Sequence, residues 1–272
     1  MEVINRPDYT EKVKKLFGKG FIIALTGQRR VGKSFIMRQV IKELSQDSAA
    51  HVIYIDKDNE EFSFVQSHEE LTKYVKSNLL SNKRNYLFVD EIQNIKEFEV
   101  SLRSFHTNDE CEMVITGSNA KMLSSELSTY LSGRCVEYHI QSLDYREFLT
   151  FHRLSDNNQS LHSYLKYGGL PQLHRIGLEE TELVDDYLKS VYHTIVLKDV
   201  IEREEIRNVP LLKNLIRFVG DNVGKVFSAS SIVKYLKSQQ VDSSTRVILN
   251  YLEYLCNAYI INRVNRYDIH GK

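Results

Sequence analysis

The chain has 272 residues, 42% of them hydrophobic, and its 36 Lys and Arg are balanced by 36 Asp and Glu. A chain of this size buries a large core and is expected to hold more than one domain. The zero formal charge does not favour a whole-surface attraction to nucleic acid, which leaves only a local basic patch open.

Three features of the sequence bear on its compartment. The three cysteines lie far apart and form no CxxC, which excludes a disulfide framework or a cysteine zinc site and fits a reducing cytoplasm. Residues 1–15 carry no apolar signal core. No apolar run approaches the roughly 20 residues that cross a bilayer. We therefore expect a soluble, cytoplasmic protein that does not contact membranes.

The first half of the chain alternates short apolar runs with amphipathic stretches. Apolar residues at helical spacing predict helices over 34–46 and 67–81. Five apolar runs predict buried strands, at 21–25, 51–55, 86–89, 112–116 and 135–140. This order is typical of an α/β fold, a parallel sheet with helices on both faces. Nearly continuous apolar runs fit strands that are buried on both sides.

After residue 141 the strand signals give way to helical ones. Short helices are predicted at 141–152 and 161–168, and a long one at 180–204 with apolar residues along one stripe. Together they predict a small helical subdomain that follows the sheet.

The last part of the chain has a different order of predicted elements. Its pattern predicts three helices and then a strand-like segment, at 210–224, 228–240, 242–261 and 259–267. Three helices and a strand within about sixty residues suggest a winged helix-turn-helix, a fold that places its third helix in the DNA major groove.

The segment Gly27-Gln28-Arg29-Arg30-Val31-Gly32-Lys33-Ser34 fits the P-loop pattern GxxxxGK[ST], between a predicted strand and a predicted helix. Such a loop turns backbone N–H groups toward phosphate oxygens, and the next helix adds the positive end of its dipole. Lys33 is expected to contact the β- and γ-phosphates and Ser34 to ligate Mg²⁺. The expected nucleotide-binding residues are Gly27, Gln28, Arg29, Arg30, Val31, Gly32, Lys33, Ser34 and Phe35.

A second motif, Tyr86-Leu87-Phe88-Val89-Asp90-Glu91, places two carboxylates at the carboxyl end of a buried strand. Open α/β sheets bind their ligands at that edge. Asp90 is expected to hold Mg²⁺, as in other P-loop NTPases, and Glu91 to orient and deprotonate the attacking water.

Two further positions are candidates for catalysis, each with a plain alternative. Asn119, with Ser118, follows the fourth strand and either contacts the γ-phosphate or lytic water or caps a turn. Arg134 precedes the fifth strand and either stabilises phosphoryl charge, in cis or on a neighbouring subunit's nucleotide, or is an ordinary surface residue.

Seven segments in order give a more specific resemblance: GQRRVGKS, YLFVDEIQ, ITGSN, LSGR, SLDYREFL, YLKYGGLP and KDVIER. Over essentially its whole length the chain resembles prokaryotic AAA+-like P-loop ATPases related to the archaeal-type and STAND ATPases. In that family the ATPase core leads into a domain of unknown function that contains a winged helix. The resemblance implies a sheet ordered 5-1-4-3-2. It also implies ATP rather than GTP, since the sequence holds no guanine-reading NKxD.

The chain departs from the family pattern in two places. Family members continue into a domain resembling restriction endonucleases, whereas this chain ends at Lys272, so we expect a C-terminally truncated form without nuclease-like function. No arginine of the second-sensor type can be placed in the helical subdomain, which counts against ring mechanics of the AAA+ kind.

These patterns together predict a P-loop ATPase domain at 1–141, a helical lid subdomain at 142–208 and a winged helix-turn-helix domain at 209–272. From residue 198 on there are twelve Lys and Arg against eight Asp and Glu, an excess of four that is not clustered. Segment 228–267 is therefore a candidate contact for double-stranded DNA, and a protein partner is the alternative. The sequence leaves the oligomeric state open.

The functional hypothesis is Mg²⁺-dependent ATP hydrolysis that rearranges the attached winged helix. Glu91 would act as the base, and Lys33 together with Mg²⁺, held by Ser34 and Asp90, would stabilise charge. The alternative is a nucleotide-gated switch that holds ATP or ADP, exposes the winged helix to DNA or protein, and turns over little.

Overall fold

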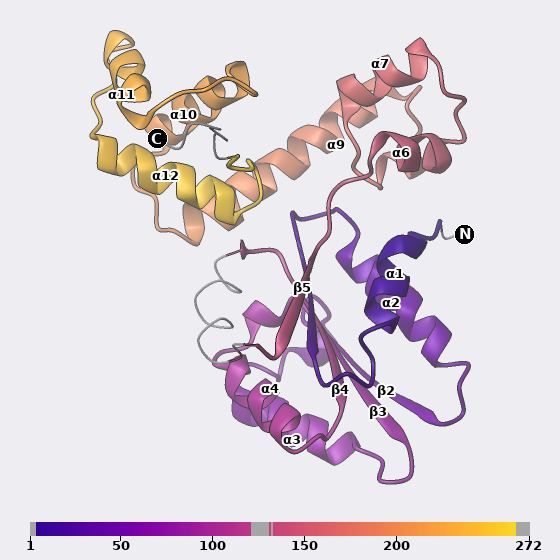
Figure 1. The fold of residues 1–272 in the computed structure, drawn as a ribbon. Coiled ribbons are helices and arrows are strands. Elements are labelled where there is room, and N and C mark those ends of the chain that lie inside the picture. The colour runs from indigo at the N-terminus through magenta and orange to yellow at the C-terminus, as the bar shows by residue number, and fades with distance from the viewer. Residues whose placement is uncertain (1–3, 121–130, 132, 265–272) are drawn as a thin grey trace, which may run out of the picture. The chain divides into compact units, whose positions relative to one another are not determined.

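A computed structural model describes residues 4–120, 131 and 133–264 (Figure 1). The chain divides into two compact units, Met1–Tyr187 and Leu188–Lys272. The limits 141/142 and 208/209 that the sequence suggests for its domains stay predictions. No helix in the described ranges is both long enough and apolar enough to cross a membrane.

The first unit is built on a five-stranded parallel sheet in the order β2-β3-β4-β1-β5. This order confirms the expected 5-1-4-3-2. All five predicted strands are present, at Ile22–Thr26 (β1), Ala50–Asp56 (β2), Arg84–Asp90 (β3), Glu112–Gly117 (β4) and Cys135–His139 (β5).

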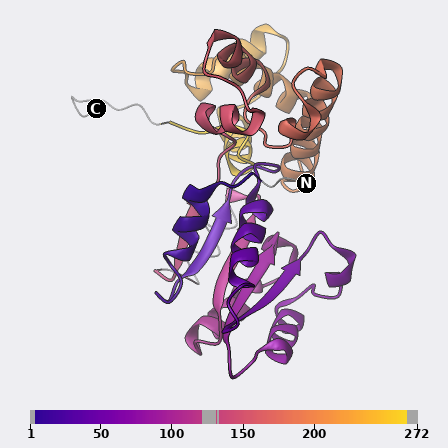
Figure 2. The same cartoon turned by 90° about the vertical axis from the view of Figure 1, so that its right-hand side faces the viewer.

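Helices cover both faces of the sheet, as Figures 1 and 2 show. They comprise α1 (Pro7–Lys14), α2 (Lys33–Leu44), α3 (His68–Asn78) and α4 (Phe98–Thr107), with short 3₁₀ turns η1 (Glu60–Phe62) and η2 (Ile92–Asn94). Helices α1 and α2 contact each other, and α3 contacts α4.

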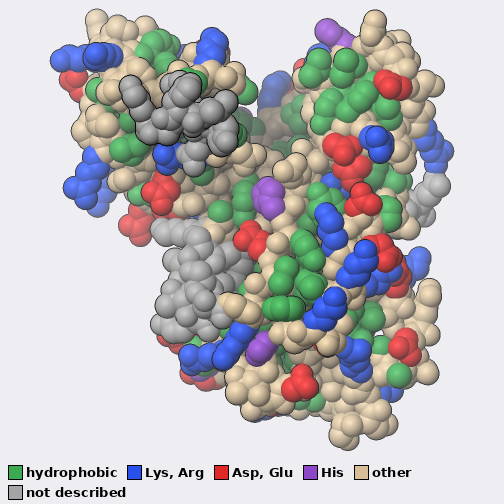
Figure 3. All heavy atoms as spheres, in the orientation of Figure 1, with side chains coloured by type: hydrophobic (Ala, Val, Ile, Leu, Met, Phe, Trp, Pro, Cys, Tyr) green, Lys and Arg blue, Asp and Glu red, His purple; other side chains and the backbone are tan. Residues whose placement is uncertain are grey.

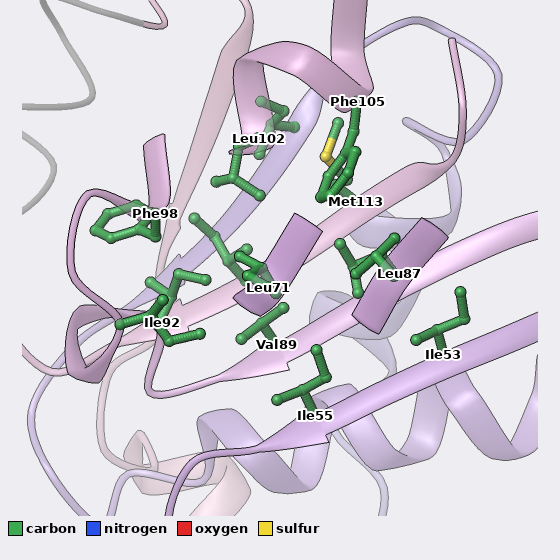
Figure 4. Close-up of a cluster of buried hydrophobic side chains, with 14 of the residues drawn as sticks. Ile53, Ile55, Leu71, Leu87, Val89, Ile92, Phe98, Leu102, Phe105 and Met113 are labelled. Carbon is green, nitrogen blue, oxygen red and sulfur yellow. The ribbon is translucent and has the colours of Figure 1, made fainter. Parts of the chain in front are cut away.

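Two hydrophobic cores form because successive side chains of a strand point to opposite faces. On β3, Leu87 and Val89 join a cluster with α3 and α4, whereas Tyr86 and Phe88 join a cluster with α1 and α2. Figure 4 shows the first cluster, in which Leu71, Leu102 and Phe105 of the helices pack over the strands. Burial on both faces explains why the strands lack polar alternation.

The first unit also holds the helices α6 (Tyr145–His152), α7 (Asn158–Tyr167) and α8 (Leu173–Ile176). Asp144 caps α6 in a reciprocal capping box with Glu147, and Leu143, Phe148 and Phe151 form a small core of their own. The short helices predicted after residue 141 are confirmed.

The predicted long helix is interrupted. Helix α9 spans Thr181–Thr194, and the chain then widens into a π-helix, η4, over Ile195–Glu202. The π-helix buries Val196, Asp199 and Val200.

The second unit continues with α10 (Val209–Asp221), α11 (Ala229–Ser238) and α12 (Thr245–Asn257), close to the three predicted helices. Helix α11 contacts both others. The strand expected at 259–267 is not formed by residues 259–264, because Tyr259 takes a φ of 56° and ends the helix in a turn. Residues 265–267 lie outside the described chain, so the winged helix stays a prediction.

The first core supplies a stability prediction. Leu102 of α4 is fully buried, so Leu102→Ala removes apolar contacts and leaves a cavity, lowering the free energy of unfolding by about 2–5 kcal/mol. Val100 of the same helix is 37% exposed, and Val100→Ala is expected to change it by less than about 0.5 kcal/mol. Urea denaturation followed by circular dichroism measures both. Equal losses in the two variants would contradict the described packing of α4.

Candidate nucleotide-binding site

The P-loop connects β1 to α2 at the carboxyl edge of the sheet. Gly27 has a φ of 136°, and a Cβ there would lie 2.2 Å from the carbonyl oxygen of Ile140, so a side chain is excluded by both backbone conformation and space. Gly32, with a φ of 100°, sits at the N-cap of α2. The glycines of the motif thus allow the turn that aims the amino end of α2 at a ligand.

Lys33 crosses the mouth of this loop. Its side chain is buried, and Nζ donates to the carbonyl oxygens of Gly27 at 2.9 Å and Gln28 at 3.0 Å. These bonds place a positive charge inside the loop, where phosphate oxygens would compete for the same three N–H donors.

The second predicted motif lies at the carboxyl end of β3, and β4 separates it from the P-loop strand. Asp90 is 3% exposed. Its Oδ1 accepts a 2.5 Å hydrogen bond from the hydroxyl of Thr116 on β4, and its carboxylate is also hydrogen-bonded to Ser34 of α2. Burial raises the pKa of Asp90, while these hydrogen bonds act to lower it.

Glu91 is joined to the same network. Its backbone N–H donates to Thr116 Oγ1 at 2.9 Å, so one threonine hydroxyl links both acidic residues. The Oε2 atom of Glu91 accepts a hydrogen bond from Ser118 Oγ at 3.1 Å and another from Gln93. Glu91 also has a φ of 54°, a left-handed conformation uncommon for a non-glycine residue.

A cleft of about 420 Å³ opens beside these groups. Small-molecule pockets commonly occupy about 300–1,000 Å³. Of the residues predicted to bind nucleotide, it is lined by Arg29, Arg30, Gly32, Lys33, Ser34 and Phe35, together with the predicted base Glu91. Gly27 and Gln28 are not in the lining, although their carbonyl oxygens accept hydrogen bonds from Lys33, and Val31 is buried.

The opposite wall of the cleft was not predicted. It comes from the N-terminal segment and from the helical subdomain, and comprises Ile4, Arg6, Phe151, Pro171, Gln172, His174 and Arg175. Pro171 comes from the segment YLKYGGLP and approaches the P-loop, since its Cγ lies 3.8 Å from the position of a Cβ on Gly32.

Charge and shape of the lining suit an anionic ligand with a flat apolar part. Among the described residues that line the cleft, five are Arg or Lys and two are Asp or Glu. The guanidinium of Arg175, on α8, lies 5.5 Å from the centre of the Phe35 ring. Sequence reasoning placed no arginine of the helical subdomain at this site, whereas the structure puts Arg175 in the lining of the cleft.

Arg6 connects the P-loop side of the cleft to the helical-subdomain side, although it lies far from both in the sequence. Its buried guanidinium forms two 2.8 Å hydrogen bonds with the carboxylate of Glu147 on α6. It also donates to the carbonyl oxygens of Val31 in the P-loop at 3.2 Å and Gln141 at 3.0 Å. A fork of donors on one side chain therefore connects the phosphate loop to the helical subdomain.

The structure does not bring the other two predicted catalytic residues to the cleft lining. Asn119 is 8% exposed and lies two residues beyond β4, next to the Ser118 that contacts Glu91. Arg134 is exposed at the opposite edge of the sheet, where its carbonyl oxygen accepts a hydrogen bond from Ile22 at the start of β1. A five-residue strand spans about 16 Å, so Arg134 is too far from the P-loop of its own chain to act in cis.

The comparisons with known proteins agree with this geometry. A family model described as an AAA domain matches residues 19–149, and one described as a domain of unknown function matches residues 158–271. An uncharacterized protein of Haemophilus influenzae is 32% identical over 279 residues, 99% of this chain and 68% of that protein. An uncharacterized protein of Methanocaldococcus jannaschii is 29% identical, over 92% of this chain and 58% of its own length.

Similarity to solved structures is weaker. The S. cerevisiae Hsp104–ADP complex matches 94% of this chain and 39% of its own at 17% identity and a TM-score of 0.47. The Aeropyrum pernix ORC1 protein in complex with DNA matches 94% and 85% at 12% identity and a TM-score of 0.44. Neither similarity is high enough to support a statement about ligand or partner.

The fold, the P-loop and the acidic strand end define a P-loop nucleotide-binding protein. The chain belongs to the family of AAA+-like P-loop ATPases, in which the AAA domain is followed by a domain of unknown function. The chain spans about two thirds of the length of the Haemophilus influenzae relative and 58% of the length of the Methanocaldococcus jannaschii relative.

The Arg6 contacts predict a measurable stability effect. Arg6→Ala breaks the buried ion pair and is expected to lower the free energy of unfolding by about 3 kcal/mol. This is the lower end of the range for breaking a buried ion pair, because the Glu147 side chain is 27% exposed and can be rehydrated. The control is Arg84→Ala, which removes an ion pair with Glu112 from a side chain that is 49% exposed and is expected to cost at most about 1 kcal/mol. Equal denaturation midpoints for the two variants would contradict the role of Arg6 in connecting the P-loop to the helical subdomain.

Proposed function

We propose that this protein is an Mg²⁺-dependent ATPase whose active site is the cleft at the P-loop. The observation that carries the proposal is the junction at Thr116, whose hydroxyl joins the carboxylate of Asp90 to the backbone of Glu91 within reach of Ser34. This junction gathers a candidate metal ligand and a candidate base from two strand ends beside a phosphate-binding loop.

The triphosphate would lie along the P-loop, with Lys33 exchanging its bonds to Gly27 and Gln28 for phosphate oxygens. The adenine ring of the nucleotide would lie between the apolar side chains of the cleft, among them Phe35, Phe151 and Pro171. Arg175 on the same wall would add charge near the phosphates. ATP rather than GTP is proposed because the sequence holds no NKxD.

The residues present fit a magnesium ion. Asp90 and Ser34 offer carboxylate and hydroxyl oxygens, the hard donors that Mg²⁺ prefers, and the ion usually keeps several waters besides such ligands and phosphate oxygens. Burial of Asp90 makes its charge costly, and a cation would offset that cost. When bound, Mg²⁺ would supply neutralisation of phosphate charge.

Hydrolysis would rest on Glu91 as acceptor of the proton of the attacking water. Ser118 and Gln93 fix its carboxylate, which orients the remaining lone pairs toward the cleft that Glu91 lines. Lys33 would stabilise charge on the transferring phosphoryl group. Asn119 remains a candidate contact to the γ-phosphate or the water, and Arg134 a candidate contact to a neighbouring subunit's nucleotide.

A nucleotide-gated switch with little turnover is the second candidate. It is favoured by the same two bonds on Glu91, because Ser118 and Gln93 occupy Oε2, an oxygen that the attacking water would otherwise contact, until a ligand rearranges them. In this version ATP or ADP would control what the C-terminal unit contacts. Under either function, we propose that the protein acts in the cytoplasm.

Double-stranded DNA is a possible partner of segment 228–267. Lys234, Lys237, Arg246 and Arg263 are exposed there. On the face shown in Figure 3, however, Lys and Arg side chains are interspersed with Asp and Glu and form no single basic surface. A protein partner is the alternative, and the predicted winged helix would serve either.

Phosphate release separates the two functions. We expect steady release from Mg-ATP by the wild type, a loss of about 100-fold or more in Glu91→Gln, and none with excess EDTA. Glu97→Gln is the matched control, since Glu97 is an exposed acid of the same segment with a similar φ of 53°. Tight ATP binding without release by the wild type would contradict the ATPase and leave the switch.

A binding titration with duplex DNA at several salt concentrations tests the partner. If segment 228–267 binds DNA, the apparent Kd rises steeply with salt, and Lys234→Ala with Lys237→Ala reduces the slope of log Kd against log salt by about two. Binding that is absent at low salt, or a slope unchanged in the double variant, would count against DNA and favour a protein partner.

A further inference from the structure

A second layer of polar side chains, Arg38, Tyr54 and Asp56, lies beside Asp90 and is separate from the nucleotide-binding residues named so far. Ser34 and Arg38 are four residues apart on α2, so they occupy the same side of the helix one turn apart. The sheet supplies their counterparts, because Asp56 at the end of β2 is the register partner of Asp90 at the end of β3. Ser34 contacts Asp90, and Arg38 contacts Asp56.

Tyr54 of β2 connects the two layers. Its hydroxyl lies 3.4 Å from Asp90 Oδ2 and 3.3 Å from Asp56 Oδ2, and it accepts a 3.4 Å hydrogen bond from Arg38 Nε. Since a phenol has one proton, it donates to one carboxylate at a time. The other oxygen of Asp90, Oδ1, is the one that Thr116 contacts.

Asp56 is itself fixed at both oxygens. Its Oδ2 accepts from Arg38 Nη2 at 3.0 Å, and its Oδ1 accepts from the backbone N–H of Asp58 at 3.1 Å. Arg38 compensates the charge of Asp56 through this 3.0 Å contact, whereas the Tyr54 hydroxyl is the group that approaches Oδ2 of Asp90. The single phenol proton is therefore expected to be donated to Asp90 rather than to Asp56.

We propose that Tyr54, anchored by Arg38 and Asp56, is a positioning residue that fixes the Asp90 carboxylate in the orientation needed to bind the divalent cation of the nucleotide. Thr116 holds one carboxylate oxygen and Tyr54 the other, so the rotation of the group about its last bond is set before the cation arrives. This inference rests on the proposed Mg²⁺-nucleotide site.

The exposure of Arg38 indicates that its ion pair with Asp56, whose side chain is 16% exposed, contributes little to stability. The side chain of Arg38 is 54% exposed, and ion pairs of such residues contribute little to folding. Hydrogen-bond partners of metal ligands behave differently, since their removal typically weakens metal affinity by about 10- to 100-fold.

The test compares nucleotide binding with and without the metal. ATP is titrated into the full chain by calorimetry, once with Mg²⁺ and once with excess EDTA, and Mn²⁺ binding in the presence of ATP is followed by electron paramagnetic resonance. Tyr54→Phe keeps the ring and removes the hydroxyl. We expect its Kd for ATP in EDTA to match the wild type within about twofold, and its Mn²⁺ affinity to fall by about tenfold or more.

Two further variants complete the design. Arg38→Gln removes the anchor from an exposed position and is expected to weaken Mn²⁺ binding in the same direction by a smaller factor. Tyr138→Phe is the control, because its hydroxyl donates to the carbonyl oxygen of Lys12 and makes no contact with the acidic layer.

The outcomes are distinguishable from a failure of the proposed function. Wild type that binds Mg-ATP, with Tyr54→Phe and Arg38→Gln unchanged in Mn²⁺ affinity, overturns the positioning role and leaves the nucleotide site intact. If Tyr54→Phe weakens ATP binding in EDTA by the same factor as it does with metal, the positioning role is also overturned. That pattern would show general damage to the cleft. A wild type whose ATP affinity does not depend on Mg²⁺ overturns the metal site itself and this inference with it.

Discussion

Burial of the Asp90 charge is the constraint around which the nucleotide site is organised. A carboxylate that is 3% exposed has lost most of its hydration, and hydrogen bonds from Thr116 and Ser34 replace part of it. These donors come from β4 and from the start of α2, so satisfying one charge fixes the acidic strand end against both the neighbouring strand and the P-loop helix. Glu91 follows, because its backbone N–H donates to the same threonine hydroxyl.

Completion of the cleft depends on segments that lie far away in the sequence. A parallel sheet brings the ends of β1, β3 and β4 to one edge without further help. The remaining wall requires the N-terminal segment and the helical subdomain, and Arg6 joins them to the P-loop through Glu147 and the carbonyl oxygen of Val31. The arrangement of this wall is thus a property of long-range contacts.

The sequence predicted what depends on local pattern. The strands, the order implied by the family resemblance, the P-loop and the acidic strand end all follow from apolar runs and motifs a few residues long. It did not predict Arg6 or Arg175, because a single arginine in an irregular segment or a four-residue helix carries no periodic signal. Arg134 precedes a strand, as expected, but the direction of that strand places it at the wrong edge for its own nucleotide. The π-helix after Thr194 was missed since its apolar stripe reads like that of an α-helix.

The most direct test of the central claim, that the P-loop cleft binds nucleotide, is a calorimetric titration of Mg-ADP into the wild type and into Lys33→Ala. Lys33 places a buried positive charge inside the loop, so we predict saturable binding to one site in the wild type and a Kd raised at least about tenfold in the variant. Equal Kd values for the two proteins, with the variant shown to be folded by circular dichroism, would contradict the account.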